Sequence, residues 1–91
     1  MAIEVRVPTA LRQHTDGEQK VVGQGSTLAE LLDDLESRHA GLRGALVRDD
    51  GQLHRFINVY ANDEDVRFLG GLQTPLDDGD TVSILPAVAG G

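Results

Sequence analysis

The fold is decided by the last sixteen residues, Leu76-Asp77-Asp78-Gly79-Asp80-Thr81-Val82-Ser83-Ile84-Leu85-Pro86-Ala87-Val88-Ala89-Gly90-Gly91. An Asp-rich turn leads into residues 81–85, whose side chains alternate as in a half-buried strand, with Val82 and Ile84 on one side. Beyond Pro86 there is no charged side chain, nucleophile or metal ligand. Chain ends are usually polar and frayed. An apolar end tipped by Gly-Gly therefore indicates that the terminal carboxylate is the working group.

Four more strands are predicted upstream of this stretch. Residues 2–8 alternate between apolar and polar side chains, and residues 20–22 resemble a second strand that pairs with them across a long loop. The run richest in β-forming residues is 53–61. Residues 66–68 form a further brief strand, which we expect to pair with that run across a polar turn.

The strongest helix signal begins at Thr27. Its hydroxyl can cap the first turn while Glu30 reaches back to the cap amide, which is the pattern of a capping box. Four leucines then fall on one face of the helix: Leu28, Leu31, Leu32 and Leu35. The pattern predicts a helix over about 27–39, stopped by Gly41 in a left-handed conformation.

The element order β-β-α-β-β-β predicts an α+β domain of two layers, in which one helix covers one face of a mixed sheet. A right-handed crossover from the second strand to the third brings the first and last strands together in the middle of the sheet. We expect residues 1–86 to form this domain and residues 87–91 to form an exposed tail.

Composition excludes several classes of function. The 91 residues suffice for one domain, and a net charge of −7 disfavours a nucleic-acid partner, which requires a basic surface. The expected partner surface is basic or apolar. There is no cysteine and therefore no disulfide or thiolate nucleophile. No apolar run approaches the ~18 residues of a membrane span, so we expect a cytoplasmic protein.

Other polar motifs are interpreted as structural. The three histidines lack metal-ligand spacing, and the acidic residues 77–80 lack the ligand pattern of a calcium loop. Residues 23–27 lack the lysine of a phosphate-binding loop and are expected to form a strand-to-helix turn. We expect no metal site and no catalytic residue.

One family shares the C-terminal pattern. The ubiquitin-like sulfur-carrier proteins of the ThiS and MoaD type have a signature similar to Leu76-x-Asp78-Gly79-Asp80-x-Val82-x-Ile84-x-Pro86-x-Val88-x-Gly90-Gly91. Residues 53–60 and 62–68 resemble more closely the actinobacterial CysO branch of that family. The resemblance implies a β-grasp fold, with a mixed sheet of four to five strands, one main helix and a flexible C-terminal tail.

The resemblance also implies a protein co-substrate that is not itself an enzyme and holds no cofactor. An activating enzyme related to ubiquitin E1 would use ATP to adenylate the carboxylate of Gly91, and a sulfur donor would convert it to a thiocarboxylate. In the CysO branch the sulfur passes to a pyridoxal-phosphate-dependent cysteine synthase acting on phosphoserine. A zinc metalloprotease of the JAMM type then releases the cysteine. We expect the free carrier to be a monomer.

The residues themselves fit such a role. Glycines at the end remove the Cβ atoms that would hinder entry into a narrow active site. The residues expected to thread into a partner are Pro86, Ala87, Val88, Ala89 and Gly90. Leu85 faces away from the apolar side of its strand, so it either docks the partner or packs within the fold. Phe68 is a second docking candidate.

Several related functions remain open from the sequence. The sulfur could serve thiamin or a secondary metabolite, or the chain could be the small subunit of molybdopterin synthase. A protein modifier joined to lysines is a further alternative. The chain has one lysine, Lys20, which offers few points for self-linked polymers.

Overall fold

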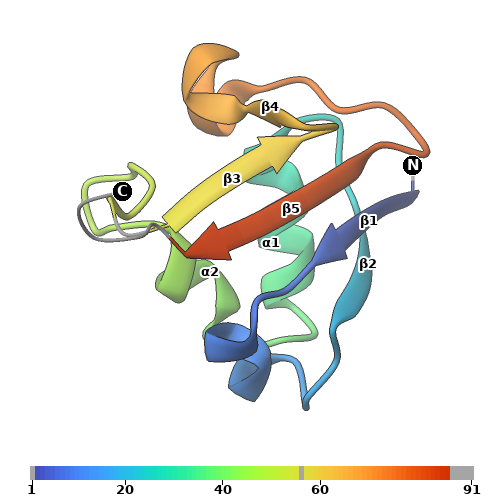
Figure 1. The fold of residues 1–91 in the computed structure, drawn as a ribbon, viewed down its shortest axis with the longest axis vertical. Helices are drawn as coiled ribbons and strands as arrows, with labels where there is room; N and C mark the ends of the chain where they lie inside the picture. Colours follow the sequence, from blue (N-terminus) through green and yellow to red (C-terminus); the bar gives the residue numbers. More distant parts are fainter. Residues whose placement is uncertain (1, 56, 87–91) are drawn as a thin grey trace.

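The computed structural model of the protein describes residues 2–55 and 57–86. Five strands form one mixed sheet in the order β2-β1-β5-β3-β4 (Figure 1). The strands are β1 (Ala2–Arg6), β2 (Lys20–Gln24), β3 (Ile57–Ala61), β4 (Glu64–Asp65) and β5 (Thr81–Pro86). Two α-helices, α1 (Leu28–Glu36) and α2 (Leu42–Leu46), and three 3₁₀ segments, η1 (Thr9–His14), η2 (Val66–Phe68) and η3 (Gly71–Gln73), complete the described elements.

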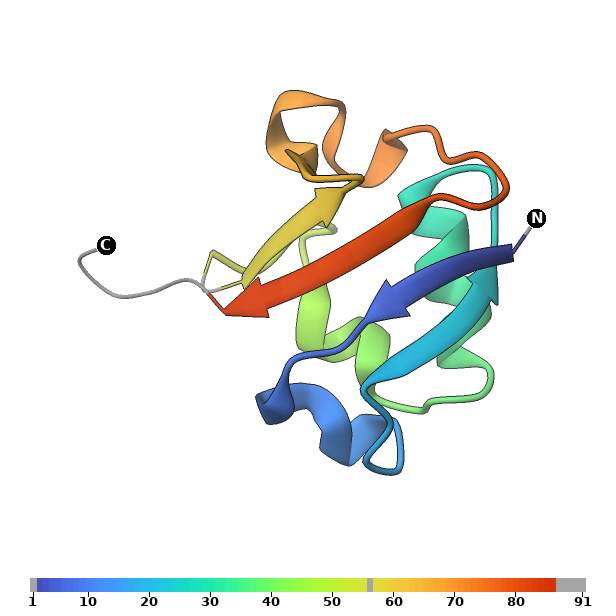
Figure 2. The ribbon, with the colours of Figure 1, turned by 45° about the vertical axis from the view of Figure 1, so that its right-hand side comes forward.

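The last strand lies in the middle of the sheet, as the sequence predicts. β5 is parallel to β1 on one side and antiparallel to β3 on the other, so the first and last strands are neighbours. Figure 2 shows β5 (red) running between β1 and β3. Pairing on both sides gives β5 two sets of ladder hydrogen bonds, which hold it more firmly than an edge strand.

Helix α1 covers one face of the sheet, behind the strands in Figure 1. Its four predicted leucines, Leu28, Leu31, Leu32 and Leu35, are at most 2% exposed. They pack with the inward side chains of the strands, among them Ile3, Val5, Val82 and Ile84. The apolar face that the 3.6-residue period gives the helix therefore packs against the apolar face that the two-residue period gives the strands, and the two form one core.

The predicted end of the helix is wrong. Helix α1 stops at Glu36, and the Ser37 hydroxyl donates to the carbonyl of Asp34 at 2.6 Å. Gly41 does adopt a left-handed conformation, with φ 93°, but there it begins α2. The carboxylate of Glu36 accepts hydrogen bonds from the amides of Gly41 and Arg43, both at 2.9 Å. These bonds turn the chain into α2 before the helix can continue.

Two predicted strands are also corrected. Of the described residues in 53–61, Ile57–Ala61 form the strand, and Leu53 makes an isolated bridge with Val47. Residues 66–68 form η2, because the carboxylate of Asp65 accepts from the amide of Arg67 at 2.9 Å and starts a 3₁₀ turn. The strand that pairs with β3 is the two-residue β4 immediately before it.

The cap of α1 yields a prediction for Thr27→Ala. The Thr27 hydroxyl accepts from the amide of Glu30 at 3.2 Å, as predicted. The Glu30 carboxylate returns to the amide and hydroxyl of Ser26, at 3.0 and 2.8 Å, rather than to Thr27. Loss of the Thr27 cap should destabilise the domain by about 1 kcal/mol in urea unfolding. Thr27→Ser keeps the hydroxyl and should retain most of the stability; equal losses in both variants would contradict a capping role.

The turn into α2 yields a prediction about pH. Hydrogen bonds from the amides of Gly41 and then Arg43 lower the pKa of Glu36 below its ordinary value of 4.5. A lowered folded-state pKa stabilises the fold above the unfolded-state pKa, and this contribution is lost as pH falls through the folded-state value. The wild type should therefore be more stable than Glu36→Gln at pH 7, and the two should converge below pH 4.5. Urea unfolding across this pH range tests the prediction. If the difference in free energy of unfolding between the two proteins stays constant at acid pH, the Glu36 carboxylate does not stabilise the turn.

Candidate functional site

The candidate site is the end of β5, where the chain passes into its last five residues. Leu85 is paired with Asn58 and Pro86 with Ile57, at the beginning of β3. The point from which residues 87–91 continue is thus held by a strand that is itself paired on both sides. This arrangement gives the chain end a defined origin on the surface of the domain.

Side chains along β5 alternate between the core and the open face of the sheet. Val82 and Ile84 are at most 2% exposed, whereas Leu85 is 46% exposed. The predicted exposure of Leu85 is confirmed. Its docking role stays a prediction, but an apolar side chain on the face that α1 leaves open is available to a partner.

Phe68 lies on a different element. It belongs to η2, which follows β4 at the edge of the sheet, and it is 87% exposed. The strand β3 therefore stands between Phe68 and Leu85. Leu69, next to Phe68, is 41% exposed and extends the apolar surface. Sequence reasoning missed Leu69; its signal was a second apolar residue just before Gly70-Gly71.

Arg67 links η2 to the end of β5. Its guanidinium donates to the side-chain oxygen of Asn58 at 2.9 Å and to the carbonyl of Ile57 at 2.8 Å. These are the two residues of β3 that pair with Leu85 and Pro86. No sequence pattern singles out this arginine, which fixes the element that carries Phe68 to β3, the neighbour of the strand that carries Leu85.

The other end of β5 is held by a polar turn. The Asp80 carboxylate accepts from the amide of Asp77 at 2.8 Å, and the side chain of Asn62 accepts from the amide of Thr81 at 3.0 Å. The hydrogen bond from the Asp77 amide, and after it the Asn62 side chain, lowers the pKa of Asp80. The central strand is therefore fixed at its start as well as at its end.

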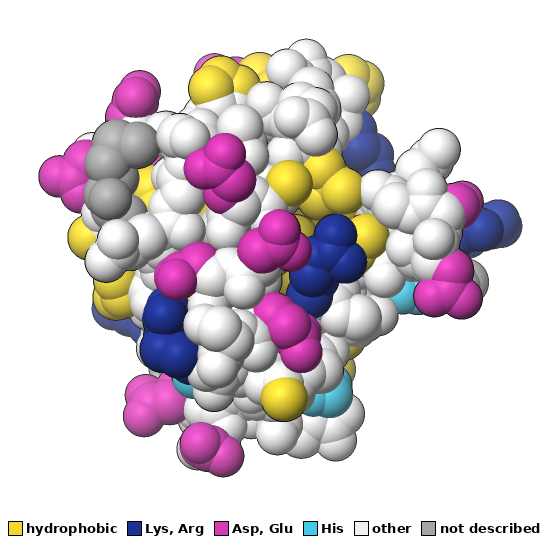
Figure 3. All heavy atoms as spheres, turned by 180° about the vertical axis from the view of Figure 1, so that it is seen from behind, with side chains coloured by type: hydrophobic (Ala, Val, Ile, Leu, Met, Phe, Trp, Pro, Cys, Tyr) yellow, Lys and Arg dark blue, Asp and Glu magenta, His cyan; other side chains and the backbone are white. Residues whose placement is uncertain are grey.

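Charged side chains of both signs lie on the helix side of the molecule (Figure 3). On the helix side, acidic side chains are spread over the surface, with basic side chains between them (Figure 3). The chain as a whole carries a net charge of −7. A partner with a basic rim would be attracted to such a surface, and this attraction would weaken with salt.

The predicted modification and threading residues, Ala87, Val88, Ala89, Gly90 and Gly91, lie outside the described residues. Pro86 is described, and it is the last residue of β5. Within residues 2–55 and 57–86 no three His, Asp or Glu side chains are placed to hold a metal ion together. In the same part of the chain, no helix has the length and apolarity required to cross a membrane.

The arrangement defines a class of protein. A mixed sheet with its first and last strands parallel at the centre, one helix across one face and a chain end leaving from the central strand is the ubiquitin-like β-grasp fold. Nothing in the described site combines a nucleophile with a base.

Comparison with known proteins gives the family. The chain matches the ThiS family over residues 5–91, and it belongs to that family. It is 52% identical to the sulfur carrier protein CysO of Mycobacterium tuberculosis, with all of both chains covered. It is 37% identical to small archaeal modifier protein 3 of Haloferax volcanii, again over both full chains.

A solved structure agrees with the fold. The BexX/CysO complex of Amycolatopsis orientalis contains a chain that matches this one with a TM-score of 0.92 and 60% identity. The match covers 99% of this chain and all of the other. The sequence-based assignment to the ThiS and MoaD type, the CysO resemblance and the β-grasp fold are confirmed.

Proposed function

We propose that this protein is a sulfur carrier whose C-terminal Gly91 is adenylated and converted to a thiocarboxylate that donates sulfur for cysteine biosynthesis. It is a substrate of partner enzymes rather than an enzyme. The observation that carries the proposal is the Gly-Gly chain end leaving a firmly held central strand, in a chain 52% identical to the M. tuberculosis sulfur carrier.

The chemistry requires help from partners. A carboxylate is a poor electrophile, so an ATP-dependent activating enzyme related to ubiquitin E1 would first join one of its oxygens to AMP, with release of pyrophosphate. Sulfur then replaces AMP at the carbonyl carbon. A thioacid is more acidic than an alkyl thiol and is ionised near neutral pH, which makes it a nucleophile. The carrier itself needs no bound cofactor.

Three kinds of partner follow from this role. The activating enzyme forms the thiocarboxylate, a pyridoxal-phosphate-dependent cysteine synthase accepts the sulfur, and a JAMM-type zinc metalloprotease frees the product and the carrier. The A. orientalis structure, in which a CysO chain is in complex with BexX, supports a protein partner for this carrier. Residues 86–90 would thread into each active site.

The mass of the intact protein tests the proposal. After incubation with an activating enzyme, ATP and a sulfide source, the mass should increase by the difference between one sulfur and one oxygen. Omission of ATP is the matched control and should leave the mass unchanged. Release of pyrophosphate in the presence of the carrier shows that the activating enzyme is competent. If the mass of the carrier is unchanged under these conditions, the proposal is overturned.

A second candidate is a protein modifier, because the chain shares 37% identity with a small archaeal modifier protein. In that role the activated Gly91 would form isopeptide bonds with lysines of other proteins. The two functions separate in one experiment: incubation with activating enzyme and ATP in the absence of sulfide would give conjugates for a modifier and none for a sulfur carrier.

We further propose that Leu85 and Phe68 dock the activating enzyme, since both are exposed apolar side chains. Arg67, next to Phe68, donates to Asn58, which is the β3 partner of Leu85. Truncation of a docking residue costs about 1–2 kcal/mol. Leu85→Ala and Phe68→Ala should therefore each raise the KM of thiolation about 5- to 30-fold. Val22→Ala, at a site 59% exposed on β2, is the control and should leave KM unchanged. If all three variants behave alike, the docking surface lies elsewhere.

A further inference from the structure

The outer edge of β2 is the starting point. β2 pairs with β1 along one side only, and it ends the sheet. The amide of Val7 donates to the carbonyl of Gln19. Backbone groups alternate along a strand, so Val21 and Gly23 face β1 while Val22 and Gln24 face away from it. Such outward groups are a template on which another strand can pair.

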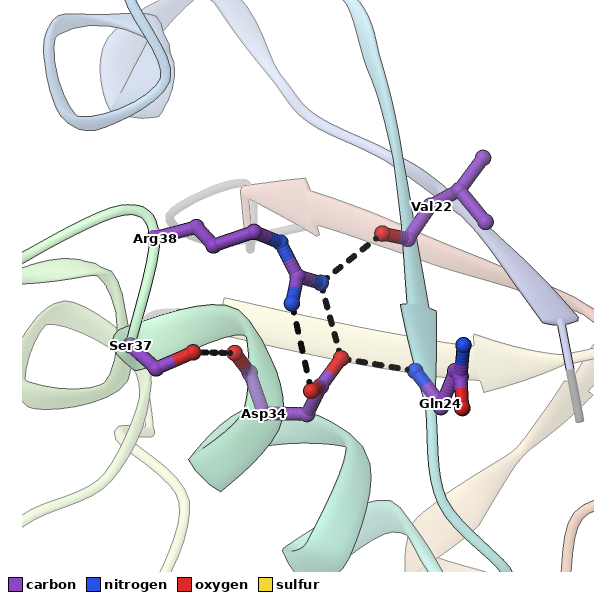
Figure 4. Close-up of polar contacts among 5 residues, drawn as sticks. All are labelled: Val22, Gln24, Asp34, Ser37 and Arg38. Atoms are coloured by element: carbon purple, nitrogen blue, oxygen red, sulfur yellow. Dashed lines mark hydrogen bonds and ion pairs between the residues drawn. The ribbon is translucent and has the colours of Figure 1, made fainter.

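Asp34, near the end of α1, and Arg38, two residues beyond the helix, occupy this edge with their side chains (Figure 4). The guanidinium of Arg38 donates to the carbonyl of Val22 at 3.0 Å, and the carboxylate of Asp34 accepts from the amide of Gln24 at 2.8 Å. The same two side chains are joined to each other by two hydrogen bonds, at 2.7 and 3.2 Å. One ion pair therefore satisfies both a backbone acceptor and a backbone donor of the edge.

The two side chains make the same hydrogen bonds to β2 that a neighbouring strand would make. A neighbouring antiparallel strand would donate an amide to the Val22 carbonyl and accept from the Gln24 amide. Arg38 supplies the donor and Asp34 supplies the acceptor. Hydrogen bonds from Arg38 and then from the Gln24 amide lower the pKa of Asp34, so the carboxylate is ionised at neutral pH. The side chains are 30% and 47% exposed, so the pair lies at the surface and blocks approach from solvent.

The opposite edge of the sheet is protected differently. It ends in β4, which is only two residues long and consists of Glu64 and Asp65. Short, charged edge strands resist pairing with other chains. β2 has five residues and carries Val22, which is 59% exposed. Of the two edges, β2 is the one long enough to accept a strand, and it is the one that the ion pair covers.

We propose that the outer edge of β2 is a pairing surface for the same edge of a second copy of this chain, and that the Asp34–Arg38 pair holds it closed. β2 is self-complementary about a two-fold axis through Val22. In an antiparallel pair centred there, Val22 lies opposite the second copy's Val22, and Lys20 lies opposite the second copy's Gln24. No like charges oppose one another, and two exposed valines meet across the axis.

When the ion pair covers the edge of β2, the sheet face that carries Leu85 stays limited to one copy of the chain. Pairing through β2 would join two five-stranded sheets into one continuous sheet of ten strands, and the faces that carry Leu85 in the two copies would become one extended surface. Partner enzymes that bind a single carrier would then meet a second copy on the same surface. The ion pair is thus a device that maintains the monomer.

The test compares two charge-neutral double variants by sedimentation equilibrium. Asp34→Ser with Arg38→Ser opens the edge. Asp33→Ser with Arg43→Ser removes an ion pair between α1 and α2, whose atoms are 2.8 Å apart, and leaves β2 untouched. The wild type and the second variant should remain monomeric. The Asp34→Ser, Arg38→Ser variant should shift from monomer toward dimer between about 10 µM and 1 mM. Its dimer dissociation constant should be at least ~10-fold lower than that of the wild type.

Addition of Val22→Pro identifies the surface. The amide of Val22 faces outward, so its loss spares the ladder to β1 while removing a donor from the new interface. The triple variant should be monomeric again. Circular dichroism establishes that each variant is folded, and Arg38→Ser alone, which frees the Val22 carbonyl, should show partial dimerisation. A folded open-edge variant that stays monomeric at 1 mM, or a dimer that persists with Val22→Pro, would overturn the proposal.

Discussion

Deletion of Gly91 is expected to abolish thiocarboxylate formation. Each extended residue spans about 3.3–3.6 Å, so the shortened chain would place its carboxylate that far from the reacting position. A misplacement of about 1 Å can already cost a factor of 100 in rate. The rate of thiocarboxylate formation should therefore fall by more than about 1,000-fold, which is roughly the largest loss that intact mass measurement can follow.

The matched control for this deletion is Ala87→Gly. It removes a methyl group from the same segment but keeps the number of residues, so the carboxylate can still reach the activating enzyme. The control should be thiolated with at most a several-fold change in rate. Both proteins should unfold at the wild-type temperature, because the core consists of side chains from Ile3 to Ile84. Thiolation of the deletion variant at the control's rate would contradict a role for Gly91.

The parts of the fold that the sequence predicts are those set by local periodicity. Four leucines at helical spacing define the buried face of α1, and the alternation of Val82 and Ile84 defines the buried face of β5. The central position of β5 follows from the right-handed crossover rule. Each of these features depends on neighbours in sequence or on a general rule of chain geometry, and each is confirmed.

The features that the sequence does not predict depend on individual hydrogen bonds from side chains to the backbone, which no periodic pattern reveals. Helix α1 ends early because Glu36 binds amides of the next helix, and residues 66–68 leave the strand because Asp65 caps a 3₁₀ turn. The Asp34–Arg38 pair has the ordinary i,i+4 spacing of a solvated ion pair. Only the fold shows that the pair also binds the edge of β2.

The candidate site also has features that the sequence predicts and features that it does not. The exposure of Leu85 follows from the two-residue period of its strand, and the structure confirms it. The link between Leu85 and Phe68 could not be anticipated, since it passes through Arg67 and Asn58, which are nine residues apart in sequence. The roles of residues 86–91 come from chemistry and from family membership, and they stay predictions.

The close approach of β2 to α1 gives a large predicted effect on stability. A Cβ atom at Gly25 would lie 2.5 Å from the backbone nitrogen of Leu31 and 2.9 Å from the carbonyl carbon of Glu30. Backbone atoms cannot rotate away as a side chain can, so α1 would have to shift from the sheet. Overpacking of this kind costs about 1–3 kcal/mol, and occasionally more. A domain of this length is stable by about 5–14 kcal/mol, so the loss is substantial.

Gly25→Ala should therefore lower the melting temperature by roughly 5–20 °C, at about 4–8 °C per kcal/mol for a domain of this size. Gly44→Ala is the matched control, because a Cβ there meets nothing within 4 Å and Gly44 lies inside α2. Alanine is favoured over glycine in helices, so this variant should gain about 0.5–1 kcal/mol. If the two Gly→Ala changes shift the melting temperature in opposite directions, the loss of stability in Gly25→Ala comes from the packing of α1 against the turn after β2. If Gly25→Ala melts at the wild-type temperature, α1 does not pack as closely against that turn as the structure requires.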